Sequence, residues 1–516
     1  MRKIAALIAV VAMFLLLASS ASASTPKVKL GNEVLLSKHQ YLIQGQRVGL
    51  ITNQSGVNSQ GKSLIDILAA DRSVNLAALY SPEHGLDGIA KAGEYVESVT
   101  HPTLGIPVYS LYGVTRKPTP DMLKNVDVLL FDMQDIGART YTYMSTLNYC
   151  MVAAKENNKK IIVLDRPNPV GGVIIEGPVL EDRFITFVGV DNLPKAHGMT
   201  AGELAQFFNR KIGANLTVIP MEGYYREMIF QNTGLQWVQT SPNIPDIESA
   251  FGYMATGLGE GTGIHMADKF KWIGGKGIDS HRFAQLLNQA GLPGVEFVPE
   301  PRGTSGGVRL NITDYHTFNP AKTGIYALTY ANSLGNFTIP KSTANNIVMF
   351  DKIMGTDKIG RYLDQGLTPQ QIEALYAPAL NRFKEERKKY LIYGYQNDPA
   401  SKTIKVEVRG NPISFDAAPY IDSNNRVMAP LRAIGEALGA RVDYSSEART
   451  INISRQGKAT RFTIGSKLVL ADGEQKIMDT SPVIRNNRTM VPLRYVGEYL
   501  GLRVNWDSAT QTVTVD

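Results

Sequence analysis

Three short polar segments contain the residue types best suited to chemistry. They are SPEHG at 81–85, DMQDIGAR at 132–139 and DRPNP at 165–169, and each follows an apolar run that predicts a buried β-strand. In an open parallel sheet, the carboxyl ends of the strands form the edge at which ligands bind. Each segment alone could be an ordinary turn. Because the pattern occurs three times, we expect the segments to share one site.

The carboxylates of these segments fit glycoside hydrolysis. That reaction needs an acid to protonate the leaving oxygen and usually a second carboxylate as base or nucleophile. Glu83 is the preferred acid, because a carboxyl that follows a buried strand is partly removed from water, which favours its protonated form. His84 could orient that acid or donate to a substrate. The candidates for the second carboxylate, which spacing alone does not rank, are Asp132, Asp135 and Glu176.

Further polar residues could bind a substrate. Arg139 offers a guanidinium fork to a carboxylate, and Tyr141 and Tyr143 could contact the faces of sugar rings. An equally favoured alternative is an Arg139–Asp135 pair beside two core tyrosines. The last two residues from this edge, which could contact substrate or hold their own loop, are Asp165 and Asn168.

Cofactors and metals find little support. Cys150 is the only cysteine, which excludes an internal disulfide and metal sites built on several cysteines, and we expect it to be a buried apolar residue. The adjacent Glu83 and His84 alone are weak grounds for a metal. No G-x-G-x-x-G follows the first predicted strand, so dinucleotide binding is unsupported. We therefore expect neither metal nor cofactor.

The elements that must position these residues alternate between strand and helix. Strands are predicted at 47–52, 74–80, 106–111, 126–131 and 160–164, and helices at 63–70 and 143–157. This α/β alternation predicts a Rossmann-like parallel-sheet lobe over residues 28–190. An α+β auxiliary lobe is expected over 191–395. Its first helix, 201–211, should begin at a capping box formed by Thr200 and Glu203, followed by a strand at 216–221, and a helix at 369–389 should close the lobe.

The C-terminal part contains an internal repeat. Residues 425–444 (NRVMAPLRAIGEALGARVDY) match residues 487–506 (NRTMVPLRYVGEYLGLRVNW), with Pro430 aligned on Pro492. Each unit predicts a short helix ended by glycine and then a β-hairpin. We expect a small α+β module of two repeats over residues 403–516.

The N-terminus predicts export. Arg2 and Lys3 precede an uncharged apolar run, 4–17, and Ala21-Ser22-Ala23 fits an A-x-A cleavage site. Residues 1–23 are therefore expected to be a cleaved signal peptide, because the run is short for a membrane anchor. The formal net charge of +7 lies in no basic cluster, so we expect no nucleic-acid partner.

Several longer motifs carry a family resemblance. They are SPEHGLDG (81–88), FDMQDIGARTYTY (131–143), LDRPNPVGG (164–172), IEGPVLE (175–181), HGMTAGELA (197–205) and SPNIP (241–245). Over residues 28–395 the chain resembles the NamZ-type exo-β-N-acetylmuramidases, formerly a domain of unknown function. The resemblance implies a Rossmann-like lobe, an auxiliary lobe and a site between them. It also implies release of terminal N-acetylmuramic acid from the non-reducing ends of peptidoglycan fragments, with Glu83 as proton donor. The motifs add three candidates for substrate binding: His197, Asn243 and Glu260.

One segment departs from the family pattern. Residues 260–269 keep Glu-Gly-Thr but lack the Ser-Glu-Gly-Arg that many members have next. If this loop touches substrate, the preferred peptide or glycan is expected to differ. Retaining, inverting and acetamido-assisted mechanisms all stay open.

The tail, 403–516, resembles the N-terminal domain of copper amine oxidases. That name does not imply copper, because the tail contains no histidine. The resemblance suggests attachment to the cell wall or a spacer. The alternative to a hydrolase is a non-catalytic wall protein that binds peptidoglycan or sugars in the same cleft.

Overall fold

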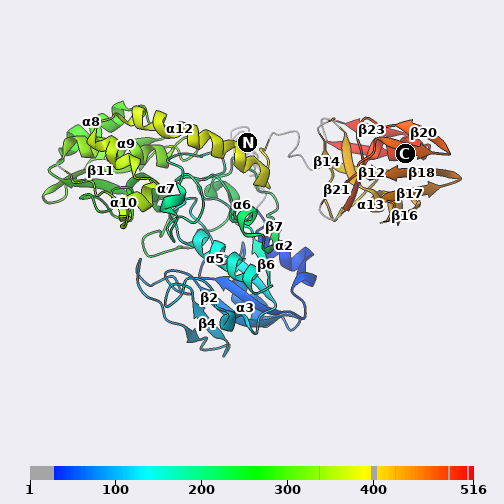
Figure 1. The fold of residues 1–516 in the computed structure, drawn as a ribbon, viewed down its shortest axis with the longest axis horizontal. Coiled ribbons are helices and arrows are strands. Elements are labelled where there is room, and N and C mark those ends of the chain that lie inside the picture. Colours follow the sequence, from blue (N-terminus) through cyan, green and yellow to red (C-terminus); the bar gives the residue numbers. More distant parts are fainter. Residues whose placement is uncertain are drawn as a thin grey trace, which may run out of the picture. The chain divides into compact units, whose positions relative to one another are not determined.

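The computed structural model describes residues 28–335, 337–396, 404–422, 424, 426–445, 447–485, 488–507 and 511–516. The predicted signal peptide lies outside the described residues. The chain divides into two compact units, Met1–Ile392 and Tyr393–Asp516 (Figure 1). In the part of the chain that the structure describes, no helix combines the length and apolarity needed to cross a membrane.

A seven-stranded sheet forms the first lobe, in the order β3-β4-β2-β1-β5-β6-β7. All neighbours pair in parallel except the short edge strand β3. The predicted Rossmann-like sheet is confirmed. The strands are β1 (Arg47–Thr52), β2 (Asn75–Ser81), β3 (Val99–Thr100), β4 (Pro107–Ser110), β5 (Val128–Asp132), β6 (Lys160–Leu164) and β7 (Asn215–Ile219).

Helices cover both faces of this sheet. Because side chains alternate along a strand, Leu129 and Phe131 of β5 pack on one face with α5 (Tyr143–Glu156) and α6 (Ala201–Ile212). Val128 and Leu130 pack on the other face with α2 (Gly31–Lys38) and α3 (Leu64–Ala70). Burial on both faces explains why these strands are apolar throughout. Cys150 on α5 is fully buried, as expected.

The first lobe runs past the expected boundary at residue 190. β7 pairs in parallel with β6, so α6 and β7 form one more helix–strand crossover of the same sheet. The predicted capping box is present: the Thr200 hydroxyl accepts from the Glu203 amide, and the Glu203 carboxylate accepts from the Thr200 amide. The strand at 216–221 was expected, but sequence alone did not assign it to this sheet.

An antiparallel sheet, in the order β10-β11-β9-β8, forms the second lobe. A single hydrophobic cluster contains residues of both lobes, so the lobes pack as one unit. Its strands are β8 (Ile264–Ala267), β9 (Trp272–Lys276), β10 (Val295–Pro299) and β11 (Ser305–Ile312). Its helices are α7 (Ile247–Thr256), α8 (Ser280–Gln289), α9 (Pro320–Leu334), α10 (Met349–Met354), α11 (Lys358–Asp364) and α12 (Pro369–Glu386). Shorter helices of this unit are α4 (Pro120–Leu123), η1 (Gln40–Leu42), η2 (Asp182–Phe184), η3 (Phe230–Thr233) and η4 (Arg387–Tyr390).

The C-terminal unit has the predicted two-repeat build. In each repeat a helix is followed by an antiparallel hairpin, and the first helix ends at Gly439 in the left-handed conformation. The helices are α13 (Leu431–Leu438) and α14 (Leu493–Tyr499). The strands are β12 (Lys405–Val408), β13 (Asn411–Pro412), β14 (Tyr420–Ile421), β15 (Val427–Pro430), β16 (Arg441–Ser445), β17 (Thr450–Arg455), β18 (Lys458–Thr463), β19 (Leu468–Ala471), β20 (Glu474–Ile477), β21 (Val483–Arg485), β22 (Arg488–Pro492), β23 (Val504–Asp507) and β24 (Thr512–Val515).

Candidate functional site

Glu83 and Tyr112 follow two neighbouring strands at the same edge of the sheet. β2 and β4 are parallel neighbours, and Ser81 lies opposite Ser110 in their register. Glu83 is two residues beyond Ser81 and Tyr112 is two residues beyond Ser110. The register therefore places the carboxyl and the phenol at the same level of the edge.

Two hydrogen bonds fix the Glu83 carboxylate, whose residue is 8% exposed. The Gly93 amide donates to Oε1 at 2.8 Å, and the Thr142 hydroxyl donates to Oε2 at 2.5 Å. Gly93 has φ +77°, a left-handed conformation that favours glycine. A threonine hydroxyl can accept as well as donate, so the bond to Thr142 suits either protonation state of Glu83.

His84 holds the loop that carries Gly93. Its φ of +73° is strained for a residue other than glycine. Its Nδ1 lies 2.7 Å from the Ala90 carbonyl oxygen, which only accepts, so Nδ1 carries the proton. The imidazole thus fixes the 84–90 turn and orients the acid indirectly, one of its two predicted roles.

The charge of Glu83 acts on three phenols: Tyr112, Tyr143 and Tyr253. Burial is the largest cause that raises the pKa of each, and the negative charge of Glu83 raises it further. For Tyr253 the pKa rises to about 12, and the charge of Glu260 also contributes. Tyr253 lies on α7 of the second lobe. The phenols therefore stay protonated at neutral pH, and both lobes contribute to the site.

Arg116 lies on an aromatic platform beside this group. Its guanidinium carbon is 4.0 Å from the ring centroid of Tyr112 and 4.5 Å from that of Phe187. Tyr149 extends the platform, with its centroid 5.3 Å from that of Phe187. Among the described residues, Arg116 forms no ion pair with a carboxylate. The sequence analysis did not select Tyr112 and Arg116, although they follow β4 at the same sheet edge. The strand-end rule, which selects polar residues just after the carboxyl end of a parallel strand, could have found them.

Tyr141 and Tyr143 are core tyrosines. Their rings meet edge to face with centroids 4.8 Å apart, and both residues are buried. The Tyr141 hydroxyl donates to Thr240 Oγ1 at 2.9 Å, and the Tyr143 hydroxyl donates to the Thr240 carbonyl. They anchor the segment that carries the exposed Asn243 and do not offer their faces to a sugar.

Arg139 takes neither of its predicted partners. It is buried and donates to the carbonyls of Ile353 at 2.8 Å and Lys352 at 3.4 Å. Burial lowers its pKa to about 10. Its fork therefore binds the backbone of the second lobe, because that segment presents carbonyls where the sequence suggested a carboxylate ligand or Asp135.

A buried lysine connects to Tyr253. Lys195 donates to the Thr140 hydroxyl at 2.8 Å, and that hydroxyl lies 2.9 Å from the phenol oxygen of Tyr253. Burial, with the positive charge of Arg139, holds the pKa of Lys195 well below its usual range. Neither Lys195 nor Thr140 was predicted, because only the tertiary fold brings them to Tyr253.

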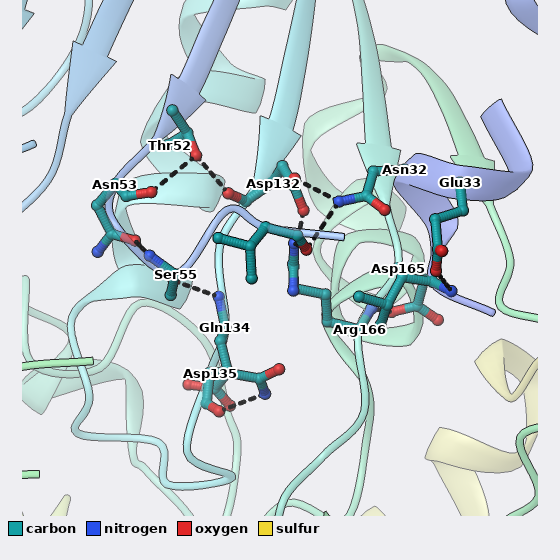
Figure 2. Close-up of polar contacts among 12 residues, drawn as sticks. Asn32, Glu33, Thr52, Asn53, Ser55, Asp132, Gln134, Asp135, Asp165 and Arg166 are labelled. Atoms are coloured by element: carbon teal, nitrogen blue, oxygen red, sulfur yellow. Dashed lines mark hydrogen bonds and ion pairs between the residues drawn. The ribbon is translucent and has the colours of Figure 1, made fainter. Parts of the chain in front are cut away.

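Asp132 belongs to a separate network (Figure 2). It is fully buried, accepts from Arg166 Nε at 2.6 Å and accepts from Asn32 Nδ2 at 3.0 Å. The adjoining pocket, lined in part by Arg166 and Trp237, has a volume of about 70 Å³, far below the several hundred Å³ of a usual ligand site. These contacts give Asp132 a structural role.

Asp135 and His197 form a second buried pair. Asp135 Oδ2 accepts from the Gly137 amide at 2.9 Å and lies 3.3 Å from His197 Nε2. His197 Nδ1 accepts from the Met199 amide at 3.2 Å, which leaves the proton of the neutral ring on Nε2, toward Asp135. The Asp135 charge also acts on Tyr141, whose pKa is raised mainly by burial.

Asp165 and Asn168 hold their own segment. Asp165 accepts from the Thr200 hydroxyl at 2.8 Å and the Gly202 amide at 2.7 Å. Asn168 accepts from the Val170 amide and donates to the Met199 carbonyl, both at 3.1 Å. Of the two roles that the sequence left open, contact with substrate or support of their own loop, these contacts favour the second for both residues.

Glu176 points toward the second lobe. One carboxylate oxygen accepts from the Gly177 amide at 2.9 Å. Its charge adds to the effect of burial in raising the pKa of Tyr376 on α12. The Glu176 carboxylate therefore interacts with the Gly177 amide and the Tyr376 phenol.

The altered segment, 260–269, runs into β8. The Thr262 hydroxyl donates to the Gly259 carbonyl at 2.7 Å, and Asp268 pairs with Arg309 at 2.7 Å. Glu260 is exposed, and its charge acts on the same phenol, Tyr253, as that of Glu83. Glu260 therefore shares a neighbour with the acid, as does Arg139, whose charge also acts on Tyr253. The described residues include no group of three or more histidine, cysteine or acidic side chains placed to hold a metal.

The fold and this site define a class of two-lobed α/β protein with a buried glutamate among phenols. Comparison with protein families assigns it. Residues 48–248 match the N-terminal domain of the exo-β-N-acetylmuramidase NamZ, and residues 251–393 match its C-terminal domain. The chain belongs to the NamZ family of exo-β-N-acetylmuramidases, which are glycoside hydrolases. Residues 407–515 match the copper amine oxidase N-terminal domain.

Individual relatives agree with this assignment. The peptidoglycan β-N-acetylmuramidase NamZ of Bacillus subtilis (strain 168) is 44% identical over 387 residues, which is 72% of this chain and 93% of that protein. Two crystal structures of DUF1343 family proteins from Bacteroides fragilis are similar. One is 37% identical with a TM-score of 0.63, and covers 71% of this chain and 99% of its own. The other is 27% identical with a TM-score of 0.55, and the match covers 72% of this chain and 99% of that protein.

Proposed function

We propose that this protein acts outside the cell and releases N-acetylmuramic acid from the non-reducing ends of peptidoglycan fragments. The similarity to the Bacillus subtilis enzyme supports the substrate. Export is supported by the leader pattern of residues 1–23 and by the location of peptidoglycan outside the membrane.

Glu83 donates the proton in this proposal. The observation that carries it is a buried carboxylate held by Gly93 and Thr142 among protonated phenols. The proton passes from Glu83 to the glycosidic oxygen while the bond from C1 to that oxygen breaks. The shortened fragment leaves with that proton, water supplies the hydroxyl at C1, and the remaining proton of the water restores the protonated Glu83.

Arg116 recognises the muramic acid in this scheme. N-acetylmuramic acid differs from N-acetylglucosamine by a lactyl group that ends in a carboxylate. A guanidinium on an aromatic platform, free of internal carboxylate partners and beside Tyr112, suits that anion. Arg116 therefore binds the substrate carboxylate, the role that the sequence suggested for Arg139.

The test is hydrolysis of the disaccharide N-acetylmuramyl-β-1,4-N-acetylglucosamine by the wild type and by Glu83→Gln. We expect the wild type to release both sugars and the variant to bind the disaccharide without turnover. Wild-type protein that binds the disaccharide but never cleaves it would contradict the proposal and identify a binding protein.

A further inference from the structure

The two repeats of the C-terminal unit are related by an approximate two-fold axis. β15 and β22 pair antiparallel at the centre, with Ala429 opposite Val491. These two residues occupy the same position in the two repeats, as do Pro430 and Pro492. The symmetry produces two equivalent grooves.

The grooves agree in size and in most of their lining, except that Asp416 and Glu436 line only the first. One has a volume of about 490 Å³ and the other about 520 Å³. The first is lined by Leu431, Arg432, Val442, Tyr444, Ile451 and Arg488. The matching residues of the second are Leu493, Arg494, Val504, Trp506, Val513 and Arg426. Each groove thus has an apolar floor, one aromatic ring and two arginines. Three of the four arginines already form ion pairs: Arg488 with Asp416, Arg426 with Asp479 and Arg494 with Glu498.

Folding explains the floor and the three paired arginines, but not the two aromatic rings or Arg432. Tyr444 is 49% exposed and Trp506 is 39% exposed, so neither ring is needed to fill the core. Arg432 and Arg494 are exposed in the first turns of their helices, where the helix dipole disfavours a cation. Within the described residues Arg432 has no hydrogen bond or ion pair. Both repeats nevertheless carry an exposed aromatic ring and an arginine at these positions.

We infer that the two grooves bind peptidoglycan strands, each groove holding one sugar–carboxylate segment of the polymer. An exposed aromatic ring suits a pyranose face, and arginine suits a carboxylate. Grooves of about 500 Å³ are in the range of small-ligand sites. Peptidoglycan repeats both features along one strand, because its sugars carry peptide stems with carboxylates. The choice of this polymer rests on the proposed function.

Two sites on one module make binding bivalent. Once one groove is occupied, the second meets the same polymer at high effective concentration, and affinity rises well beyond that of one groove. The module would thereby keep the enzyme on its insoluble substrate without taking part in the reaction.

The test is sedimentation of the whole chain, carrying Glu83→Gln to prevent cleavage, with peptidoglycan sacculi freed of phosphate-containing polymers. The groove variant is R432A/R494A, and a second variant is Y444A/W506A. The matched control is R441A/R503A, which removes the same charge from exposed, repeat-related positions outside both grooves. We expect both groove variants to lose affinity by roughly 10²-fold and the control to bind like the parent.

Equal loss in control and groove variants would overturn the inference, because binding would then depend on charge alone. Binding only to sacculi that retain their phosphate polymers would also overturn it. Hydrolysis of the soluble disaccharide by chains with intact Glu83 separates this inference from the proposed function. The groove variants should cleave it at the wild-type rate, whereas failure of the proposed function would abolish cleavage in every variant.

Discussion

The Thr142 hydroxyl lies 2.5 Å from Oε2 of Glu83, so the residue before α5 fixes the acid that follows β2. Their proximity depends on strand order: β1 lies between β2 and β5 in the sheet, and the loop after β5 must cross it. The acid is therefore positioned by a part of the chain 59 residues away.

Thr142→Val should lower kcat for the disaccharide by roughly 10- to 100-fold, because a hydrogen bond to a charged group contributes about 1.5–3 kcal/mol. KM should change little, and the pH–rate profile should shift because Thr142 acts through Glu83. Steady-state kinetics from pH 4 to 8 measure both. Thr146→Val, one turn along α5, is the matched control. A variant with an unchanged profile would show that Thr142 is only structural.

Arg116→Met should raise KM for the disaccharide by roughly 30-fold, which corresponds to about 2 kcal/mol of lost charge-assisted hydrogen bonding. The measurement compares the natural disaccharide with one whose lactyl carboxylate is amidated. The wild type should prefer the natural form, and the variant should not distinguish them. Lys117→Met is the control, because Lys117 already pairs with Glu156. Preserved discrimination in Arg116→Met would place the carboxylate elsewhere.

Asp132→Ala should lower the free energy of unfolding by about 3–5 kcal/mol, since it leaves the buried Arg166 without its carboxylate. Urea denaturation followed by circular dichroism measures the change. The double variant Asp132→Ala/Arg166→Met should recover part of the loss, because no charge then stays unpaired. A stable Asp132→Ala protein with no turnover would instead make Asp132 catalytic.

Lys195 should make stability depend on alkaline pH. Its pKa is lowered in the folded protein, whereas an unfolded lysine has a pKa of about 10.4. Between these values the unfolded chain binds the extra proton, so this contribution to stability is complete above about pH 10.4 and is lost as pH falls toward the folded pKa. Relative to Lys195→Met, the wild type should gain free energy of unfolding from pH 7 to pH 10. A constant difference would contradict the burial of a neutral amine.

The sheet could be predicted because its central strands contain continuous apolar runs. Arg47–Thr52 and Lys160–Leu164 were predicted with the bounds observed. The boundary between the two lobes could not be predicted, because nothing in the strand Asn215–Ile219 indicates which sheet it joins. The strand-end rule located Glu83, but it also selected Asp132 and Asp165, whose carboxylates hold loops.

Hydrogen-bond partners far along the chain explain the other differences between the predicted site and the observed one. Arg139, Tyr141 and Tyr143 have the residue types of a sugar site, yet their partners are backbone and hydroxyl groups far along the chain, such as Ile353 and Thr240. Tyr253 was missed for the same reason, since it reaches the site only by lobe packing. Spacing shows which residues lie near a strand end, but not which of them face a ligand.

The most direct test of Glu83 as proton donor compares two leaving groups in Glu83→Gln. For the disaccharide, whose leaving sugar must be protonated, loss of the acid should lower kcat by about 10²–10⁴-fold. The 2,4-dinitrophenyl β-N-acetylmuraminide releases a stable phenolate without protonation, so the variant should cleave it at close to the wild-type rate. Equal losses on both substrates would contradict the account and show that Glu83 serves some other step.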